Sequence, residues 1–117
     1  MILYVFHESE KSKPNLDFFL KHALHDAADF LFIINGETTL YNTIPARANI
    51  RVVQRENKCW DLGSIAEVLL KDDLYKRYKR FITMNGSIRG PFFPSWSRSC
   101  WTDVFLNKVT DRVKVIN

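Results

Sequence analysis

The sequence predicts an α/β fold with three layers, in which helices cover both faces of a mainly parallel, Rossmann-like sheet. Strand-like and helix-like patterns alternate along the chain, and the strand-like runs 2–6 and 30–34 are apolar throughout. Continuous apolar runs are typical of strands that are buried on both faces. Parallel strands also need crossover connections, so the alternation itself favours a mainly parallel sheet.

The first crossover helix is expected after the strand 2–6. Pro14 suits the first turn of a helix, where no N–H is needed, and Ser12 or Lys13 begins the helix. The apolar residues that follow share one helix face: Leu16, Phe19, Leu20, Ala23, Leu24 and Ala27. The next strand closes at Asn35-Gly36, and we expect an outward loop there because the following residues do not alternate as a hairpin strand would.

A second strand and helix pair follows. Residues 50–54 form an amphipathic third strand, and a polar loop then leads to Asp61, which can cap a helix. The side chains expected to face inward from that helix are Leu62, Ile65, Ala66 and Leu69.

The last part of the chain is expected to contain one helix between two strands. Residues 81–84 form the fourth strand, and a loop with Gly90-Pro91 leads to a helix capped by Thr102. Residues 113–116 are expected to form a last strand.

Length and composition predict one folded domain over residues 1–117. The chain is 46% hydrophobic, and its longest apolar run is far shorter than the about 20 residues that span a bilayer, so no membrane segment is expected. The amino terminus lacks a basic leader and is expected to be a strand rather than a signal peptide. This favours the cytoplasm, or the Golgi lumen if the chain belongs to a longer anchored protein.

The net charge of +4 favours anionic partners without separating nucleic acid from a nucleotide diphosphate. The main cluster of cations comprises Lys76, Arg77, Lys79 and Arg80. Such clusters are more often a solvated surface than a nucleic-acid interface. No nucleic-acid partner is therefore expected.

The expected topology brings polar segments together at one edge of the sheet. Right-handed crossovers favour the strand order 3-2-1-4, with a switch point between the strands 2–6 and 81–84. His7 and Glu8 would then lie beside residues 85–87, and the loop 55–61 would end at the same edge. Ligands of open α/β sheets bind in this crevice.

Several common site motifs are missing from the sequence. No GxGxxG or Walker motif follows a strand, and Ser87 does not lie in a GxSxG turn. His22 and His25 are expected to be ordinary helix-surface residues, whereas His7, at a strand end, is either functional or structural.

Three segments together resemble an uncharacterised glycosyltransferase-like family of fungi, plants and algae, which is similar at longer range to rhamnan-synthesis transferases and to GT-A type nucleotide-sugar transferases. They are YVFHESEKSKPNLDFFLKHAL, RENKCWDLG and FITMNGSIRGPF. The resemblance covers nearly the whole chain. It implies a nucleotide-sugar donor, a carbohydrate or glycoconjugate acceptor, and transfer of the sugar between them.

The resemblance also implies a donor site. It places the nucleobase near Phe6, His7 and Glu8, with Asn57 and Asp61 lining the same crevice. Asp61 as a plain helix cap is the alternative.

In GT-A enzymes the end of the fourth strand carries an Asp-x-Asp pair, which contacts the ribose and binds a divalent cation. Asn85-Gly86-Ser87 occupies that position here. Asn and Ser can bind a ribose or phosphate, but they lack the anionic oxygens that Mn²⁺ or Mg²⁺ prefers, so no metal site is expected. Arg89, Arg55 and Lys58 are the candidates for stabilising the diphosphate instead.

The acceptor-binding half of a GT-A transferase would begin where this chain ends, so we expect a donor-binding half-domain with an unknown catalytic base, and truncation at the C-terminal end stays open. The alternative is a catalytically inactive or truncated transferase-like domain that acts as an interaction module, whose exposed sheet edge or apolar face pairs with another copy of the chain or with a missing segment.

Overall fold

The protein contains one four-stranded parallel sheet in the part of the chain that the computed structural model describes, namely residues 1–56, 61–92 and 100–115. The strands are β1 (Ile2–Phe6), β2 (Phe30–Asn35), β3 (Ile50–Arg55) and β4 (Ile82–Asn85). Their order, β3-β2-β1-β4, confirms the predicted topology. β2 and β3 are parallel, so the loop after Asn35-Gly36 leads outward and makes no hairpin.

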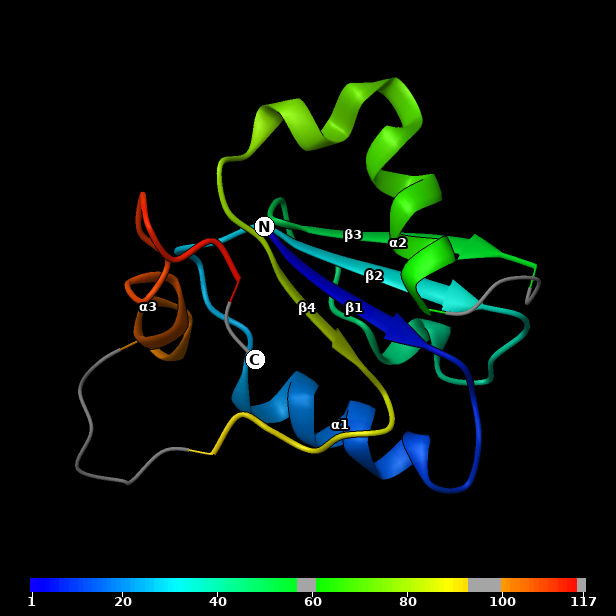
Figure 1. The fold of residues 1–117 in the computed structure, drawn as a ribbon. Helices are drawn as coiled ribbons and strands as arrows, with labels where there is room; N and C mark the ends of the chain where they lie inside the picture. Colours follow the sequence, from blue (N-terminus) through cyan, green and yellow to red (C-terminus); the bar gives the residue numbers. More distant parts are fainter. Residues whose placement is uncertain (57–60, 93–99, 116–117) are drawn as a thin grey trace.

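Helices cover both faces of the sheet, which confirms the three-layer, Rossmann-like α/β fold (Figure 1). α1 (Ser12–His22) lies on one face, whereas α2 (Asp61–Leu70) and the 3₁₀ helix η2 (Lys71–Arg77) lie on the other. The short 3₁₀ helix η1 (Tyr41–Thr43) precedes β3. α3 (Trp101–Leu106) lies beside β4.

The central strand β1 divides the core into two clusters, because successive side chains of a strand point to opposite faces. On the α1 side, Tyr4 packs on Phe19 of α1, with ring centroids 4.5 Å apart. On the α2 side, Leu3 and Val5 belong to a cluster with Val68 of α2.

The inward face of α2 differs from the predicted one. Ser64 and Val68 are its buried residues, whereas Leu62 is 81% exposed and Ala66 is also exposed. The prediction was wrong for Leu62 and Ala66 because it counted only apolar side chains. Ser64 is fully buried and forms a hydrogen bond with Asn35 of β2. The helix is therefore turned so that Ser64 faces the sheet, an orientation that the apolar residues alone do not predict.

The ends of two predicted elements were also wrong. α1 ends at His22, so Ala27 lies beyond the helix and is exposed. Thr102 lies inside α3 rather than at its cap, and its buried hydroxyl bonds to His25 Nε2 over 3.2 Å. His25 is accordingly half-buried and not a helix-surface residue.

The predicted last strand is absent from the described residues, where 113–115 form no strand, and 116 lies outside them. Val113 and Val115 are 44% and 80% exposed. An apolar alternation over so few residues forms a strand only where a sheet edge pairs with it, and no such pairing is present in the described part of the chain.

Tyr4 provides a test of the core. Its side chain is 1% exposed, and its hydroxyl has no hydrogen-bond partner within the described structure. Because an unsatisfied buried polar group costs about 1–3 kcal/mol, Tyr4→Phe should raise the free energy of unfolding by about 1 kcal/mol in urea titrations. Tyr41→Phe, at a residue that is 44% exposed, is the matched control and should change it by less than about 0.5 kcal/mol. A destabilised Tyr4→Phe variant would contradict this account.

Alkaline pH gives a second readout of the same residue. Burial raises the pKa of Tyr4 to about 12, against an unfolded value of about 10. The folded state therefore retains the proton longer than the unfolded chain, and the free energy of unfolding should fall as pH rises from 10 to 12. Tyr4→Phe should flatten this fall and leave the pH dependence below 10 unchanged, as followed by urea titration at each pH.

Candidate functional site

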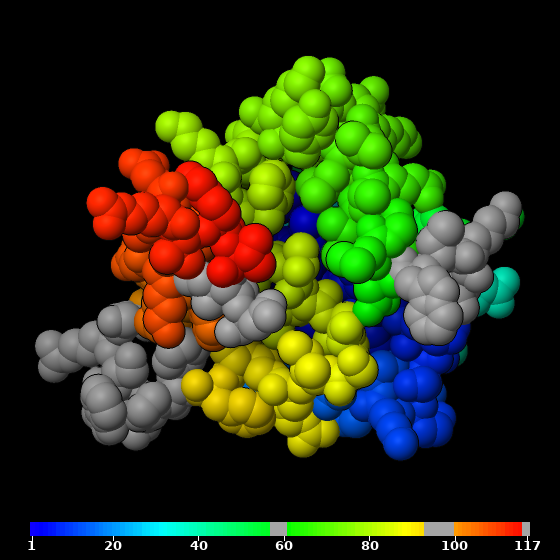
Figure 2. Space-filling model, in the orientation of Figure 1, coloured from blue at the N-terminus to red at the C-terminus, as the bar shows by residue number. Residues whose placement is uncertain are grey.

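The strand order reverses between β1 and β4, where the carboxyl ends of both strands meet. β4 stays paired to β1 up to its end, since the Gly86 N–H donates to the Val5 carbonyl over 2.9 Å. Open α/β sheets bind ligands in the crevice outside such a switch point. Figure 2 shows the end of β4 and the segment after it, in olive to yellow, at the surface between α2 in green and α1 in blue.

The structure brings three of the predicted site residues together at this switch point. Asn85 Nδ2 donates to Asp61 Oδ2 over 2.9 Å, so the amide at the end of β4 contacts the carboxylate at the start of α2. Asn85 Oδ1 accepts hydrogen bonds from the backbone N–H of Ser87, over 3.0 Å, and from its hydroxyl. The orientation of the amide is therefore set from both ends.

Asn15 of α1 connects the fourth predicted residue, Arg89, to this group. Its Nδ2 donates to the Gly86 carbonyl over 2.9 Å, and its Oδ1 accepts from Arg89 Nε over 3.1 Å. Sequence reasoning missed Asn15. Its position directly after Pro14 could have indicated this role, because the first turn of such a helix faces the carboxyl edge of a parallel sheet.

Gly86 is closely packed at the centre of the group. A Cβ atom at position 86 would lie 3.1 Å from the Phe6 ring and 3.2 Å from Ser12 Cβ. This close approach lets the turn after β4 pack directly on β1 and α1.

His7 and Glu8 were predicted to lie beside residues 85–87. Their hydrogen bonds are instead formed on the β2 side of β1. His7 Nδ1 donates to the Asn35 carbonyl over 3.0 Å. Glu8 Oε1 accepts hydrogen bonds from both Thr38 and Thr39. These hydrogen bonds lower the pKa of Glu8, and the bond from the Thr39 N–H has the largest effect. The backbone beyond β1 turns toward the loop after β2, which topology alone does not reveal.

Phe6, near which the resemblance places a nucleobase, has no exposed surface. It is fully buried and belongs to the core cluster on the α1 side, because the alternation of β1 turns even-numbered residues toward α1. Its effect on the site is indirect, through packing against the turn at Gly86.

Arg55, a predicted candidate for stabilising a diphosphate, forms its hydrogen bonds inside the fold. Its side chain is 10% exposed and bonds to Asn35 Oδ1 over 3.0 Å, to Ser64 Oγ over 2.8 Å and to the Glu67 carboxylate. A guanidinium held by a carboxylate and two polar groups joins β2, β3 and α2 and is not presented to a ligand. Asn57 and Lys58, the other predicted residues of this loop, lie outside the described residues.

The described residues do not fit a divalent cation. Asp61 supplies one carboxylate, and its Oδ2 already accepts from the Asn85 amide. No group of three or more His, Cys, Asp or Glu side chains that could hold a metal occurs in residues 1–56, 61–92 and 100–115. Mg²⁺ and Mn²⁺ bind through several hard oxygen ligands, so no chemical step is assigned to a metal here.

Fold and site together define a Rossmann-like α/β domain with a polar cluster at its topological switch point. No protein-family model matches the chain, and no curated protein or solved structure matches it either. Among the helices of the described segments, none is long and apolar enough to cross a membrane.

Gly86→Val should test the close approach at the site. Two added methyl groups beyond a Cβ that already lies 3.1 Å from Phe6 should lower the free energy of unfolding by about 1–3 kcal/mol. The matched control is Gly90→Ala, whose Cβ would lie 4.0 Å from its nearest neighbour and should change stability by less than about 0.5 kcal/mol. Equal stabilities in thermal and urea unfolding would contradict the packing argument.

Ser64→Ala should test how α2 is positioned. Loss of the hydroxyl removes hydrogen bonds to Asn35 and Arg55, so the free energy of unfolding should fall by about 1–3 kcal/mol. Ala66→Ser, on the exposed face of the same helix, makes the reverse change and should cost no more than about 0.7 kcal/mol. Similar losses for the two variants in urea titrations would show that the buried hydrogen bonds do not hold the helix.

Proposed function

We propose that the protein is a glycosyltransferase-like domain of the GT-A type that binds a nucleotide-diphosphate sugar and transfers the sugar to a carbohydrate or glycoconjugate acceptor. The observation that carries the proposal is the convergence of Asp61, Asn85, Ser87 and Arg89 at the switch point between β1 and β4. The resemblance of the three sequence segments to glycosyltransferase-like proteins supports the same assignment.

The ribose is bound where the end of β4 meets the start of α2. The Asp61 carboxylate accepts hydrogen bonds from sugar hydroxyls, and Asn85, whose amide already donates to Asp61, keeps that carboxylate in place. Asn85-Gly86-Ser87 thus stands where the resemblance implies an Asp-x-Asp pair, and Asp61 supplies a carboxylate to the same position from a different element.

The diphosphate is bound by Arg89 and the helix N-termini. Arg89 is exposed, and it forms no ion pair with a carboxylate in the described residues. α1 and α2 begin at the same edge of the sheet, and helix N-termini favour anions. A guanidinium stabilises the charge that develops on a departing diphosphate without a metal.

The second candidate function is a nucleotide-sugar-binding module without transfer. The observation that favours it is the amide and hydroxyl of Asn85 and Ser87 at the end of β4, where a metal-dependent transferase would carry two carboxylates. Under this alternative the donor binds at the same residues and is not turned over.

Calorimetry with a panel of UDP and GDP sugars, with and without Mn²⁺, tests donor binding. We expect binding that does not require Mn²⁺ and that weakens at least about tenfold, or 1.4 kcal/mol, in Asp61→Asn and Asn85→Ala. Lys21→Gln, which alters an exposed ion pair with Asp17 on α1, is the control and should bind as the unaltered protein does. Absence of binding to every sugar nucleotide by the folded protein would overturn the proposal.

Release of the nucleoside diphosphate separates the two candidate functions. A transferase should release UDP or GDP faster when a glycan acceptor is added, and Arg89→Met should slow that release more than it weakens donor binding, because its charge acts on the departing diphosphate. Binding without any release over a panel of acceptors would favour the binding module.

A further inference from the structure

The outer edge of β4 is unpaired within residues 1–56, 61–92 and 100–115. Among the residues that the structure describes, β4 pairs only with β1, and the N–H groups of Ile82 and Gly86 donate to the carbonyls of Met1 and Val5 over 3.0 and 2.9 Å. Alternate residues of a parallel strand bond to opposite sides, so the N–H and C=O of Thr83, between them, point away from β1. Neither group has a hydrogen-bond partner in the described part of the chain.

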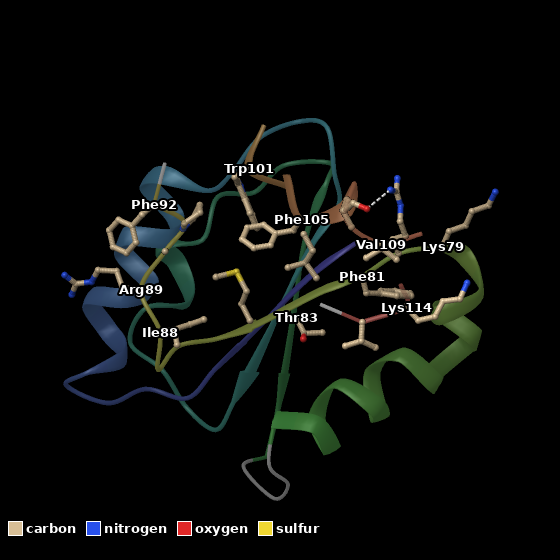
Figure 3. A pocket seen from close by; sticks show the side chains of 17 residues that line it. Lys79, Phe81, Thr83, Ile88, Arg89, Phe92, Trp101, Phe105, Val109 and Lys114 are labelled. Atoms are coloured by element: carbon tan, nitrogen blue, oxygen red, sulfur yellow. Dashed lines mark hydrogen bonds between the residues drawn. The ribbon is translucent and has the colours of Figure 1, made fainter. Parts of the chain in front are cut away.

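An apolar groove follows this edge, with a cavity volume of about 760 Å³. The lining comes from residues 79–84, 88–92, 101, 105, 106, 109, 114 and 115, which we call the β4 groove. In Figure 3, Trp101, Phe105 and Val109 lie on one side of the cavity, and Phe81 and Thr83 of the strand segment lie on the other. Ligand-binding clefts span roughly 300–1,000 Å³ and are mostly apolar, so the β4 groove is large enough to hold a bound segment.

One end of the β4 groove is cationic. Lys79, Arg80 and Lys114 line it, and in Figure 3 Lys79 and Lys114 lie at the same side of the cavity. Arg80 donates to the Leu106 carbonyl over 3.2 Å, and none of the three forms an ion pair with a carboxylate among the described residues. The occupant that complements this end carries negative charge.

Two other occupants fit these features less well. A second copy of the chain, paired antiparallel about a twofold axis near Thr83, would place Lys79 and Arg80 of each copy opposite residues 86–89 of the other, and that segment has no carboxylate to pair with them. An acyl chain with an anionic head would satisfy the apolar lining and the cations, but it has no groups for the N–H and C=O of Thr83.

We propose that the β4 groove binds an extended segment of another protein, which adds a fifth strand to the sheet beside β4. Backbone hydrogen bonds to Thr83 give this segment its alignment, as in other cases of β-strand addition. Its apolar side chains face Trp101 and Phe105, and acidic side chains at one end face Lys79 and Lys114. Arg89 belongs both to the lining of the β4 groove and to the proposed nucleotide-sugar site, whereas Thr83 forms no hydrogen bond with Asp61 or Asn85 within the described residues.

Binding of model peptides to the whole chain tests the proposal by fluorescence anisotropy. The probe is a labelled peptide of alternating valine and threonine that ends in two glutamates, and its control ends in two lysines. We expect the glutamate peptide to bind at least about tenfold more tightly, and we expect this preference to shrink as salt is added. Equal binding of the two peptides would overturn the assignment of an acidic partner.

Two variants at one position separate strand addition from simple apolar contact. Thr83→Pro removes the outward N–H at an edge strand, where proline is tolerated, and should reduce binding of the glutamate peptide at least tenfold. Thr83→Val keeps the backbone donor and should bind as the unaltered protein does. Circular dichroism checks that both variants fold. If Thr83→Pro binds the peptide normally, no strand is added and the proposal fails.

Charge reversal and sedimentation complete the test. Lys79→Glu combined with Lys114→Glu should weaken the glutamate peptide and strengthen the lysine peptide, whereas unchanged preferences would contradict the predicted orientation. Analytical ultracentrifugation should show a monomer. A concentration-dependent dimer that Thr83→Pro abolishes would assign the β4 groove to a second copy and would overturn the proposal of a different partner.

Discussion

The burial of β1 on both of its faces is the constraint on which the rest of the structure depends. All five residues of Ile2–Phe6 are buried, and their alternate side chains supply the centre of both core clusters. A strand of this kind is stable only in the middle of a sheet with a helix on each face. The central place of β1, with β2 on one side and β4 on the other, creates the switch point at which the candidate site lies.

A second, polar constraint fixes how α2 sits on that sheet. Asn35, Arg55 and Ser64 form a hydrogen-bonded group beneath α2, and the Glu67 carboxylate closes it from the helix. Buried polar groups are costly unless satisfied, so this group permits few other orientations of the helix. The start of α2 is thereby held where Asp61 meets Asn85. The residue that seemed suited to a diphosphate, Arg55, instead helps to place the carboxylate of the proposed donor site.

Much of the fold and part of the candidate site were predictable from the sequence. Apolar runs such as 30–34 have one stable location, and right-handed crossovers then favour one strand order. Asn85, Ser87 and Asp61 were predictable as neighbours because each follows directly from a strand end or a helix start. Asn15 was not, because its role depends on a carbonyl that is distant in sequence. The prediction of a last strand was wrong because residues 113–115 do not pair with a sheet edge in the described structure. Lys114 and Val115 instead line the groove beside β4.

The sequence by itself determined the α/β class, the strand order and the edge of the sheet at which polar residues gather. Those features follow from periodicity and chain connectivity, which are local properties of the chain. Only the tertiary structure decided which way each polar side chain turns. Glu8 bonds to Thr38 and Thr39, whereas Arg89 bonds to Asn15, although both side chains were assigned to one crevice. These hydrogen bonds form with residues that are distant in the sequence. The partners come within bonding distance only when the strands and helices have packed.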